Sequence, residues 1–227
     1  LAGAVGPEQP DDLAGADFQR EVRDYPALAI LLAERLRAQD AALTPALKRL
    51  TSDANGALRR GPFSVIDKAV VPPSGDKHDY LSQAPYVWPD PASPTGLPYI
   101  TRDGEVNPER YAIPDSSNLE SMISTTRTLA LAYYFAEDAR YAERASVLLR
   151  TWFVDAATRM NPNLNFAQGK PGVYTGAPGG IIDTANLPDV LDSIGLLGGA
   201  SALTAEDREG LRQWFRAYLD WLSTSKF

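Results

Sequence analysis

The sequence predicts an all-α fold in which long antiparallel helices form hairpins, joined by long polar loops on one face of the molecule. Apolar residues recur at three- and four-residue steps in several long stretches, which is the period of an amphipathic helix. The connection over residues 136–139 is so short that the helices it joins are antiparallel neighbours. No stretch shows the clear apolar and polar alternation of a half-buried strand. We therefore expect a helical toroid whose functional site lies on the loop face.

The first part of the chain is less regular than the second. Residues 1–16 are rich in Gly, Ala, Pro and acids, and we interpret them as a flexible lead-in to one domain over residues 17–227. Helical patterning begins near Phe18 and ends near Pro45, and residues 45–51 are compatible with a short second helix. The sequence DANG at 53–56 is a turn signal.

Four helices are predicted in the second part. Ser117 and Glu120 have the spacing of a capping box, and the helix they begin carries one apolar face as far as Tyr134. The next helix extends to about Ala156, and a third covers residues 183–197. Thr204 caps the last helix, whose buried side contains Leu211, Trp214, Phe215, Tyr218, Leu219 and Leu222.

Composition excludes several classes of protein. With 44% hydrophobic and 22% charged residues, the 227-residue chain is globular and long enough to bury a sizeable core. A net charge of −7, with no run of Lys or Arg, argues against nucleic acid as a partner. The absence of Cys excludes disulfides, thiolate zinc sites and a Cys nucleophile. No stretch approaches the roughly 18–20 apolar residues of a membrane span, so a membrane partner is not expected.

The loop over residues 76–109 has the composition of a binding loop. It places four aromatic residues among six prolines, interleaved with charged side chains. Aromatic faces stack on the C–H faces of a sugar, while Lys or Arg pairs with a sugar carboxylate. The alternative is a Pro-rich surface loop whose aromatic residues cap the core. The residues in question are Lys77, His78, Tyr80, Tyr86, Trp88 and Tyr99.

A second polar loop, TRMNPNLNFAQ at 158–168, groups several side-chain amides in a short span. Amides donate to hydroxyls and carboxylates and also accept, which suits a glycan subsite. The alternative is that each asparagine satisfies its own turn. These amides belong to Asn161, Asn163, Asn165 and Gln168.

Five stretches within Ser64 to Phe227 resemble the alginate lyase family, in particular its broad bacterial and fungal branch of uronate polysaccharide lyases. They read PPSGDKHDYLSQAPYVWPDP at 72–91, GLPYITRDGEVNPE at 96–109, LALAYYF at 129–135, RTWFVDAATRMNPNLNFAQ at 150–168 and GIIDTANLPDVLDSI at 180–194.

The resemblance implies an incomplete (α/α) toroid that cleaves a 1,4-linked uronate polymer, either alginate or polymannuronate or glucuronan, by β-elimination. In this family an Asn-His pair and an Arg are associated with neutralising the substrate carboxylate, and a Tyr serves as base and acid. The scheme needs no metal and no other cofactor. It also implies an acidic polysaccharide as partner and a periplasmic or secreted location.

The chain departs from the family pattern at two places. It contains no Asn-His dipeptide, and His78 is its only histidine. We therefore interpret the chain as the N-terminal part of a longer domain, with unknown catalytic residues beyond residue 227 and the C-terminal part of the same domain as a partner. Ala177 also stands after Thr175-Gly176, where the family often has Arg after Thr-Gly.

The site residues that the resemblance suggests are therefore binding residues. Tyr80 resembles a lid residue that reaches over the cleft, and Lys77 and His78 would contact a substrate carboxylate or anchor the loop. Tyr86 and Trp88 would form a stacking platform, unless Trp88 packs in the core. Four amides would line the cleft beside Arg159, which would pair with the substrate or with Asp155. These amides are those of Asn161, Asn163, Asn165 and Gln168.

Two other functions remain open from the sequence. An inverting (α/α)-toroid glycoside hydrolase would need two carboxylates about 6.5–9.5 Å apart, for which Asp79 and Asp115 are the candidates. A non-catalytic uronate-glycan-binding protein would keep the loops without the catalytic motif. The sequence does not distinguish mannuronate, guluronate and glucuronate polymers, or endo from exo action.

Overall fold

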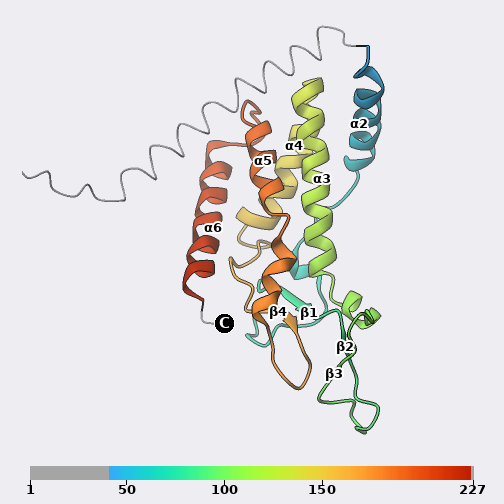
Figure 1. Ribbon diagram of the computed structural model, residues 1–227. Helices are drawn as coiled ribbons and strands as arrows, with labels where there is room; N and C mark the ends of the chain where they lie inside the picture. The colour runs from blue at the N-terminus through green and yellow to red at the C-terminus, as the bar shows by residue number, and fades with distance from the viewer. Residues whose placement is uncertain (1–40, 226–227) are drawn as a thin grey trace, which may run out of the picture. The chain divides into compact units, whose positions relative to one another are not determined.

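The computed structural model describes residues 41–225 of the chain, and helices are its commonest elements (Figure 1). The chain divides into two units, Leu1–Arg49 and Leu50–Phe227. Helix α2 (Thr44–Ala57) includes the point of division, and all later elements belong to the second unit. The predicted lead-in over residues 1–16 and nearly all of the helix predicted from Phe18 lie outside the described residues. The single domain over residues 17–227 stays a prediction.

The prediction of an all-α toroid is wrong, because the second unit contains two small sheets. Strand β1 (Leu81–Gln83) pairs in parallel with β4 (Phe166–Gly169), and β2 (Val87–Trp88) pairs antiparallel with β3 (Ile100–Thr101). These strands have two to four residues, which is too short for an alternating pattern to be visible. All three residues of β1 are buried although two of them are polar, so the strand has no solvent-exposed face.

Three helices form the centre of the hydrophobic core. Helix α3 (Asp115–Ala136) packs against both α4 (Ala139–Leu149) and α5 (Pro188–Leu196). The predicted hairpin at residues 136–139 is confirmed: Glu137 adopts a left-handed conformation that ends α3, and the Asp138 carboxylate caps α4. Fully buried side chains from this region include Leu119, Met122, Leu129, Tyr141, Leu148 and Leu149.

Several predicted boundaries differ from the observed ones. Helix α3 begins at Asp115, and the Ser117 hydroxyl donates to the Pro114 carbonyl rather than forming a capping box. The DANG sequence lies inside α2, because Ala54 and Ala57 are buried and this packing outweighs the local turn preference. Helix α4 continues as a π-helix, Arg150–Val154. The helix expected from residue 183 begins at Pro188, after the 3₁₀ helix Pro178–Thr184.

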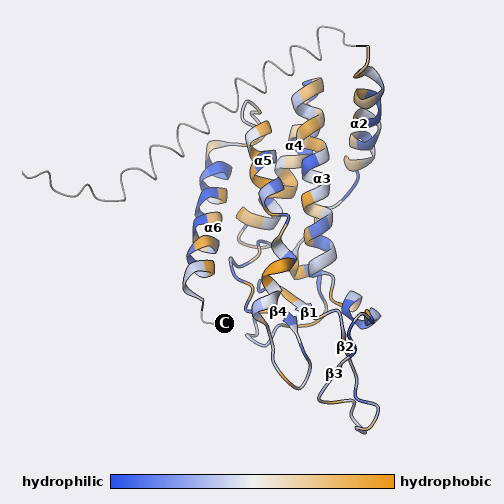
Figure 2. Cartoon of the chain, viewed as in Figure 1, coloured by the Kyte–Doolittle hydropathy of each residue, from blue (hydrophilic) through white to orange (hydrophobic). Residues whose placement is uncertain are grey.

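Helix α6 (Ala205–Thr224) has the predicted cap at Thr204, completed as a capping box by Asp207. The Asp207 carboxylate also accepts from Arg150 Nε at 2.8 Å and from its terminal nitrogen at 2.7 Å. This ion pair lowers the pKa of Asp207 and fixes α6 to the π-helix. Figure 2 shows hydrophobic and hydrophilic residues side by side along α6. Four aromatic residues of α6 form a row of ring contacts that also includes Phe153 of the π-helix: Trp214, Phe215, Tyr218 and Trp221.

Two further 3₁₀ helices, Val65–Asp67 and Pro108–Ala112, flank the segment that holds β1, β2 and β3. Across residues 41–225, no helix is both long and apolar enough to cross a membrane.

Candidate functional site

The pairing of β1 with β4 brings the two loops of the sequence analysis together. The Asn161 backbone N–H donates to the His78 carbonyl at 2.9 Å, and His78 Nδ1 lies 2.6 Å from the Arg159 carbonyl oxygen. Segment 77–83 therefore lies beside segment 159–169, although some 85 residues separate their hydrogen-bonded members in sequence. The His78 ring, in this arrangement, anchors one loop to the other.

The Asp79 carboxylate holds the asparagine-rich loop in place. One of its oxygens accepts from Asn161 Nδ2 at 2.8 Å and from Asn163 Nδ2 at 3.1 Å, and Asp79 is only 7% exposed. Asn161 also donates to Asp76 at 2.9 Å. The pKa of Asp76 is lowered by the hydrogen bond from the His78 backbone N–H and by this one from Asn161. Only Asn163 also serves its own turn, by accepting from the Asn165 N–H. These amides thus bind carboxylates of the other loop.

A second carboxylate, Asp183, accepts hydrogen bonds from three side chains in or next to β1 and β4. It accepts from the Tyr80 hydroxyl at 3.1 Å, the Ser82 hydroxyl at 2.6 Å and Gln168 Nε2 at 2.8 Å. Tyr80 has no exposed surface, and burial together with Asp183 raises the pKa of its phenol well above the ordinary value. Tyr80 is therefore a neutral donor that anchors β1 here. Sequence reasoning missed Asp183, because nothing local to it signals partners about a hundred residues away.

Beneath β1 lies a fully buried ion pair between Lys68 and Asp115, whose charged atoms are 2.8 Å apart. Lys68 Nζ also donates to the carbonyls of Val65 at 2.6 Å and Lys77 at 2.8 Å, and the Leu81 N–H donates to Asp115 at 2.9 Å. Burial raises the pKa of Asp115 to about 6, although Lys68 opposes the shift, and burial lowers the pKa of Lys68. The pair fixes the start of β1, and sequence reasoning missed Lys68.

Of the predicted stacking residues, Trp88 lies in β2 of the other sheet and Tyr86 directly precedes that strand. Tyr86 is 40% exposed, whereas Trp88 is half-buried and its indole N–H donates to the Glu105 carbonyl at 2.8 Å. The Arg102 guanidinium lies 5.2 Å from the centre of the Trp88 ring. This sheet is joined to the end of β4, because Lys170 Nζ donates to the Thr101 hydroxyl at 2.9 Å.

Three cations around these loops have no acidic partner among residues 41–225: Lys77, Arg159 and Lys170. Lys77 Nζ donates only to the Ile66 carbonyl, at 3.2 Å, and the exposed Arg159 does not pair with Asp155. Asn165 is also exposed, and its amide oxygen accepts from the Trp221 indole N–H. The substrate-binding roles of the predicted residues stay predictions.

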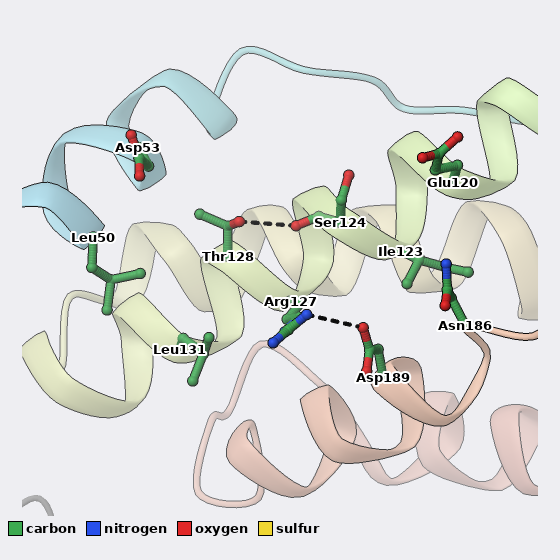
Figure 3. A pocket seen from close by; sticks show the side chains of 10 residues that line it. All are labelled: Leu50, Asp53, Glu120, Ile123, Ser124, Arg127, Thr128, Leu131, Asn186 and Asp189. Atoms are coloured by element: carbon green, nitrogen blue, oxygen red, sulfur yellow. Dashed lines mark hydrogen bonds and ion pairs between the residues drawn. The ribbon is translucent and has the colours of Figure 1, made fainter. Parts of the chain in front are cut away.

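Two cavities have similar volumes, and only one of them adjoins these strands and loops. One, of about 450 Å³, borders β1 and the end of β4, and its lining includes Leu81, Gln83, Lys170 and Tyr174. The other, of about 430 Å³, is shown in Figure 3; it contains Arg127, which already pairs with Asp189 at 3.2 Å, and the further carboxylates Asp53 and Glu120. None of the predicted site residues lines this second cavity, and its excess of carboxylates is unsuited to an acidic sugar.

The chain is similar to known polysaccharide-degrading proteins. Residues 64–227 match the family model described as alginate lyase. Among solved structures, an alginate lyase from Bacteroides ovatus is 40% identical, with a TM-score of 0.81. That match covers 87% of this chain and 52% of the other, so this chain spans about half of that protein's length. No curated protein matches the chain.

Proposed function

Because the chain belongs to the alginate lyase family, we propose that it contributes the substrate-binding loops of a polysaccharide lyase that acts on 1,4-linked uronate polymers. The observation that carries this proposal is the family match over residues 64–227, which includes both loops and all four strands. The substrates proposed are alginate or polymannuronate and glucuronan, and the location proposed is periplasmic or extracellular.

The reaction is a β-elimination in which no water is consumed. A base removes the proton from C5, the electron pair forms a C4–C5 double bond, the C4–O4 bond breaks, and O4 takes up a proton. The C5 proton becomes sufficiently acidic only when donors or cations neutralise the neighbouring carboxylate. Lys77, Arg159 and Lys170 are suited to such electrostatic work, since no acid within residues 41–225 neutralises them.

Neither His78 nor Tyr80 is an evident base in this structure. The one histidine, His78, is held against the Arg159 carbonyl, and Tyr80 is buried against Asp183. The sequence contains no Asn-His pair. Within this proposal the proton-transferring residues therefore lie outside the 227 residues, in the remainder of the same domain.

The hydrolase alternative is not favoured by the geometry of its two carboxylates. An inverting hydrolase requires one carboxylate to activate a water molecule. Asp115 has no exposed surface and is paired with Lys68, and Asp79 is occupied by two amides. Neither carboxylate is available to a polymer in a cleft.

The proposal is tested by ultraviolet absorbance of the conjugated double bond. The full product of the gene and the 227-residue chain are each incubated with alginate, polymannuronate and glucuronan. We expect absorbance to rise with the full product alone, on at least one polymer. A rise with the 227-residue chain would contradict the expected location of the base. New reducing ends without absorbance would indicate hydrolysis, and binding without either signal would indicate a glycan-binding protein.

A further inference from the structure

The cavity beside β1 and β4 is bounded by a tight turn that sets two side chains on the same face. Lys170 and Tyr174 form an antiparallel bridge, with N–H to carbonyl distances of 2.9 Å and 3.1 Å in the two directions. Paired residues in such a bridge direct their side chains to the same side. Gly172, at φ +76°, allows the chain to reverse between them. Both side chains line the cavity.

The cavity contains two side chains, Gln83 and Lys170, that keep hydrogen-bond donors unused by the described residues. Gln83 is 9% exposed, and its side-chain nitrogen is buried without a hydrogen-bond partner within residues 41–225. Buried amide groups are almost always paired, so this one indicates an absent partner. Lys170 Nζ donates to the Thr101 hydroxyl and has no acidic partner among the described residues, which leaves donors for a ligand.

Most of the remaining lining residues are apolar, and several are open to solvent. Val70 and Val71 line the cavity at 47% and 54% exposure, and the ring of Tyr174 is 43% exposed. A volume of about 450 Å³ lies within the size range of small-ligand sites, roughly 300–1,000 Å³. Apolar walls beside one cation and one amide fit a ligand with C–H faces, hydroxyls and a single negative charge.

We propose that this cavity is a subsite for one uronate residue of the polymer, and this inference rests on the proposed function. The Lys170 ammonium pairs with the sugar carboxylate, Gln83 hydrogen-bonds to a ring oxygen or hydroxyl, and Tyr174 packs against the ring face. A neutral sugar of the same size lacks the carboxylate and so binds more weakly.

Isothermal titration of the 227-residue chain and of the full gene product with trimannuronate tests the subsite, with neutral mannotriose for comparison. In both proteins we expect Lys170→Met to weaken trimannuronate binding at least about tenfold and Lys170→Arg to retain most of it. Tyr174→Ala should weaken the binding of both sugars. Lys48→Met is the matched control, because Lys48 is exposed and does not line the cavity. Circular dichroism confirms that each variant is folded.

The inference is overturned if trimannuronate does not bind, if Lys170→Met binds as the Lys48→Met control does, or if only the 227-residue chain binds. The last result would mean that other residues of the protein fill the cavity. Failure of the subsite is distinguishable from failure of the proposed function. If Lys170→Met binds trimannuronate normally and the protein still forms unsaturated products, only the subsite proposal is rejected. If binding depends on Lys170 but no unsaturated product forms, only the proposed lyase activity is rejected.

Discussion

Individual polar residues of the two loops bind mainly to one another. Asp79 accepts from two asparagines, and Asp183 accepts from Tyr80, Ser82 and Gln168. Groups with fixed partners are held in one geometry, so the loops are organised before any ligand arrives. The residues that would then meet a ligand are those left with free donors.

We expect Asp183→Ala to destabilise the protein by about 1–3 kcal/mol, because it leaves buried donors such as the Tyr80 hydroxyl without this acceptor. Urea denaturation measures the change in the free energy of unfolding. Asp192→Ala is the control, since Asp192 is exposed on α5 and its loss should cost no more than about 0.5 kcal/mol. Equal stability of the two variants would show that the Asp183 network is not structural.

A pH-dependent loss of stability is expected for Lys68→Met. The pKa of Asp115 is raised to about 6 in the folded protein, whereas it is about 3.9 in the unfolded chain. The charged carboxylate therefore lowers the free energy of unfolding, an effect that is absent below pH 3.9 and complete above the folded pKa. Without Lys68 this pKa rises further. The variant should therefore lose about 3–5 kcal/mol at alkaline pH and clearly less near pH 5, where Asp115 is neutral.

Denaturation of Lys68→Met across pH 5 to 8 checks this expectation. The double variant Lys68→Met/Asp115→Asn lacks both charges. In Lys68→Met the loss of stability relative to wild type should grow between pH 5 and 7, and in the double variant it should not. If Lys68→Met lost the same stability at every pH, this would contradict the assignment of a buried, desolvated charge at Asp115.

At the scale of single elements, two helical glycines should respond oppositely to alanine. Gly56 in α2 has open space around its position, so Gly56→Ala should stabilise the protein by about 0.5–1 kcal/mol. A Cβ on Gly210 would lie 2.8 Å from a methyl carbon of Val154, so Gly210→Ala should cost about 1–3 kcal/mol. Thermal unfolding of both variants measures the changes. A stabilising Gly210→Ala would mean that α6 does not pack closely on the π-helix.

The long helices were predictable because their apolar period persists over many residues, as in α3 and α6. The strands were not, because β1 and β4 are short and owe their existence to each other across some 85 residues. The same limit applies to the site. Both loops were evident from composition, whereas Asp183, Lys68 and Gln83 acquire their partners or their cavity only through the fold.

For the whole molecule, the net negative charge disfavours a polyanion, whereas a few cations at the loops favour it at short range. The net charge is −7, yet the loops around β1 and β4 contain Lys77, Arg159 and Lys170 without acidic partners within residues 41–225. The overall charge repels a polyanion at long range, and the loop cations act only within about 8–10 Å in physiological salt. Binding of the polymer should therefore depend on close contacts at these loops.

We propose that the protein cleaves by elimination, and mass spectrometry of the products from one defined uronate oligosaccharide distinguishes elimination from hydrolysis. Elimination consumes no water, so the masses of the two products should add up to the mass of the substrate. We expect this result when the full gene product acts on an oligosaccharide from at least one of the three polymers, which are alginate, polymannuronate and glucuronan. Product masses that exceed the substrate by one water would show hydrolysis and contradict the account.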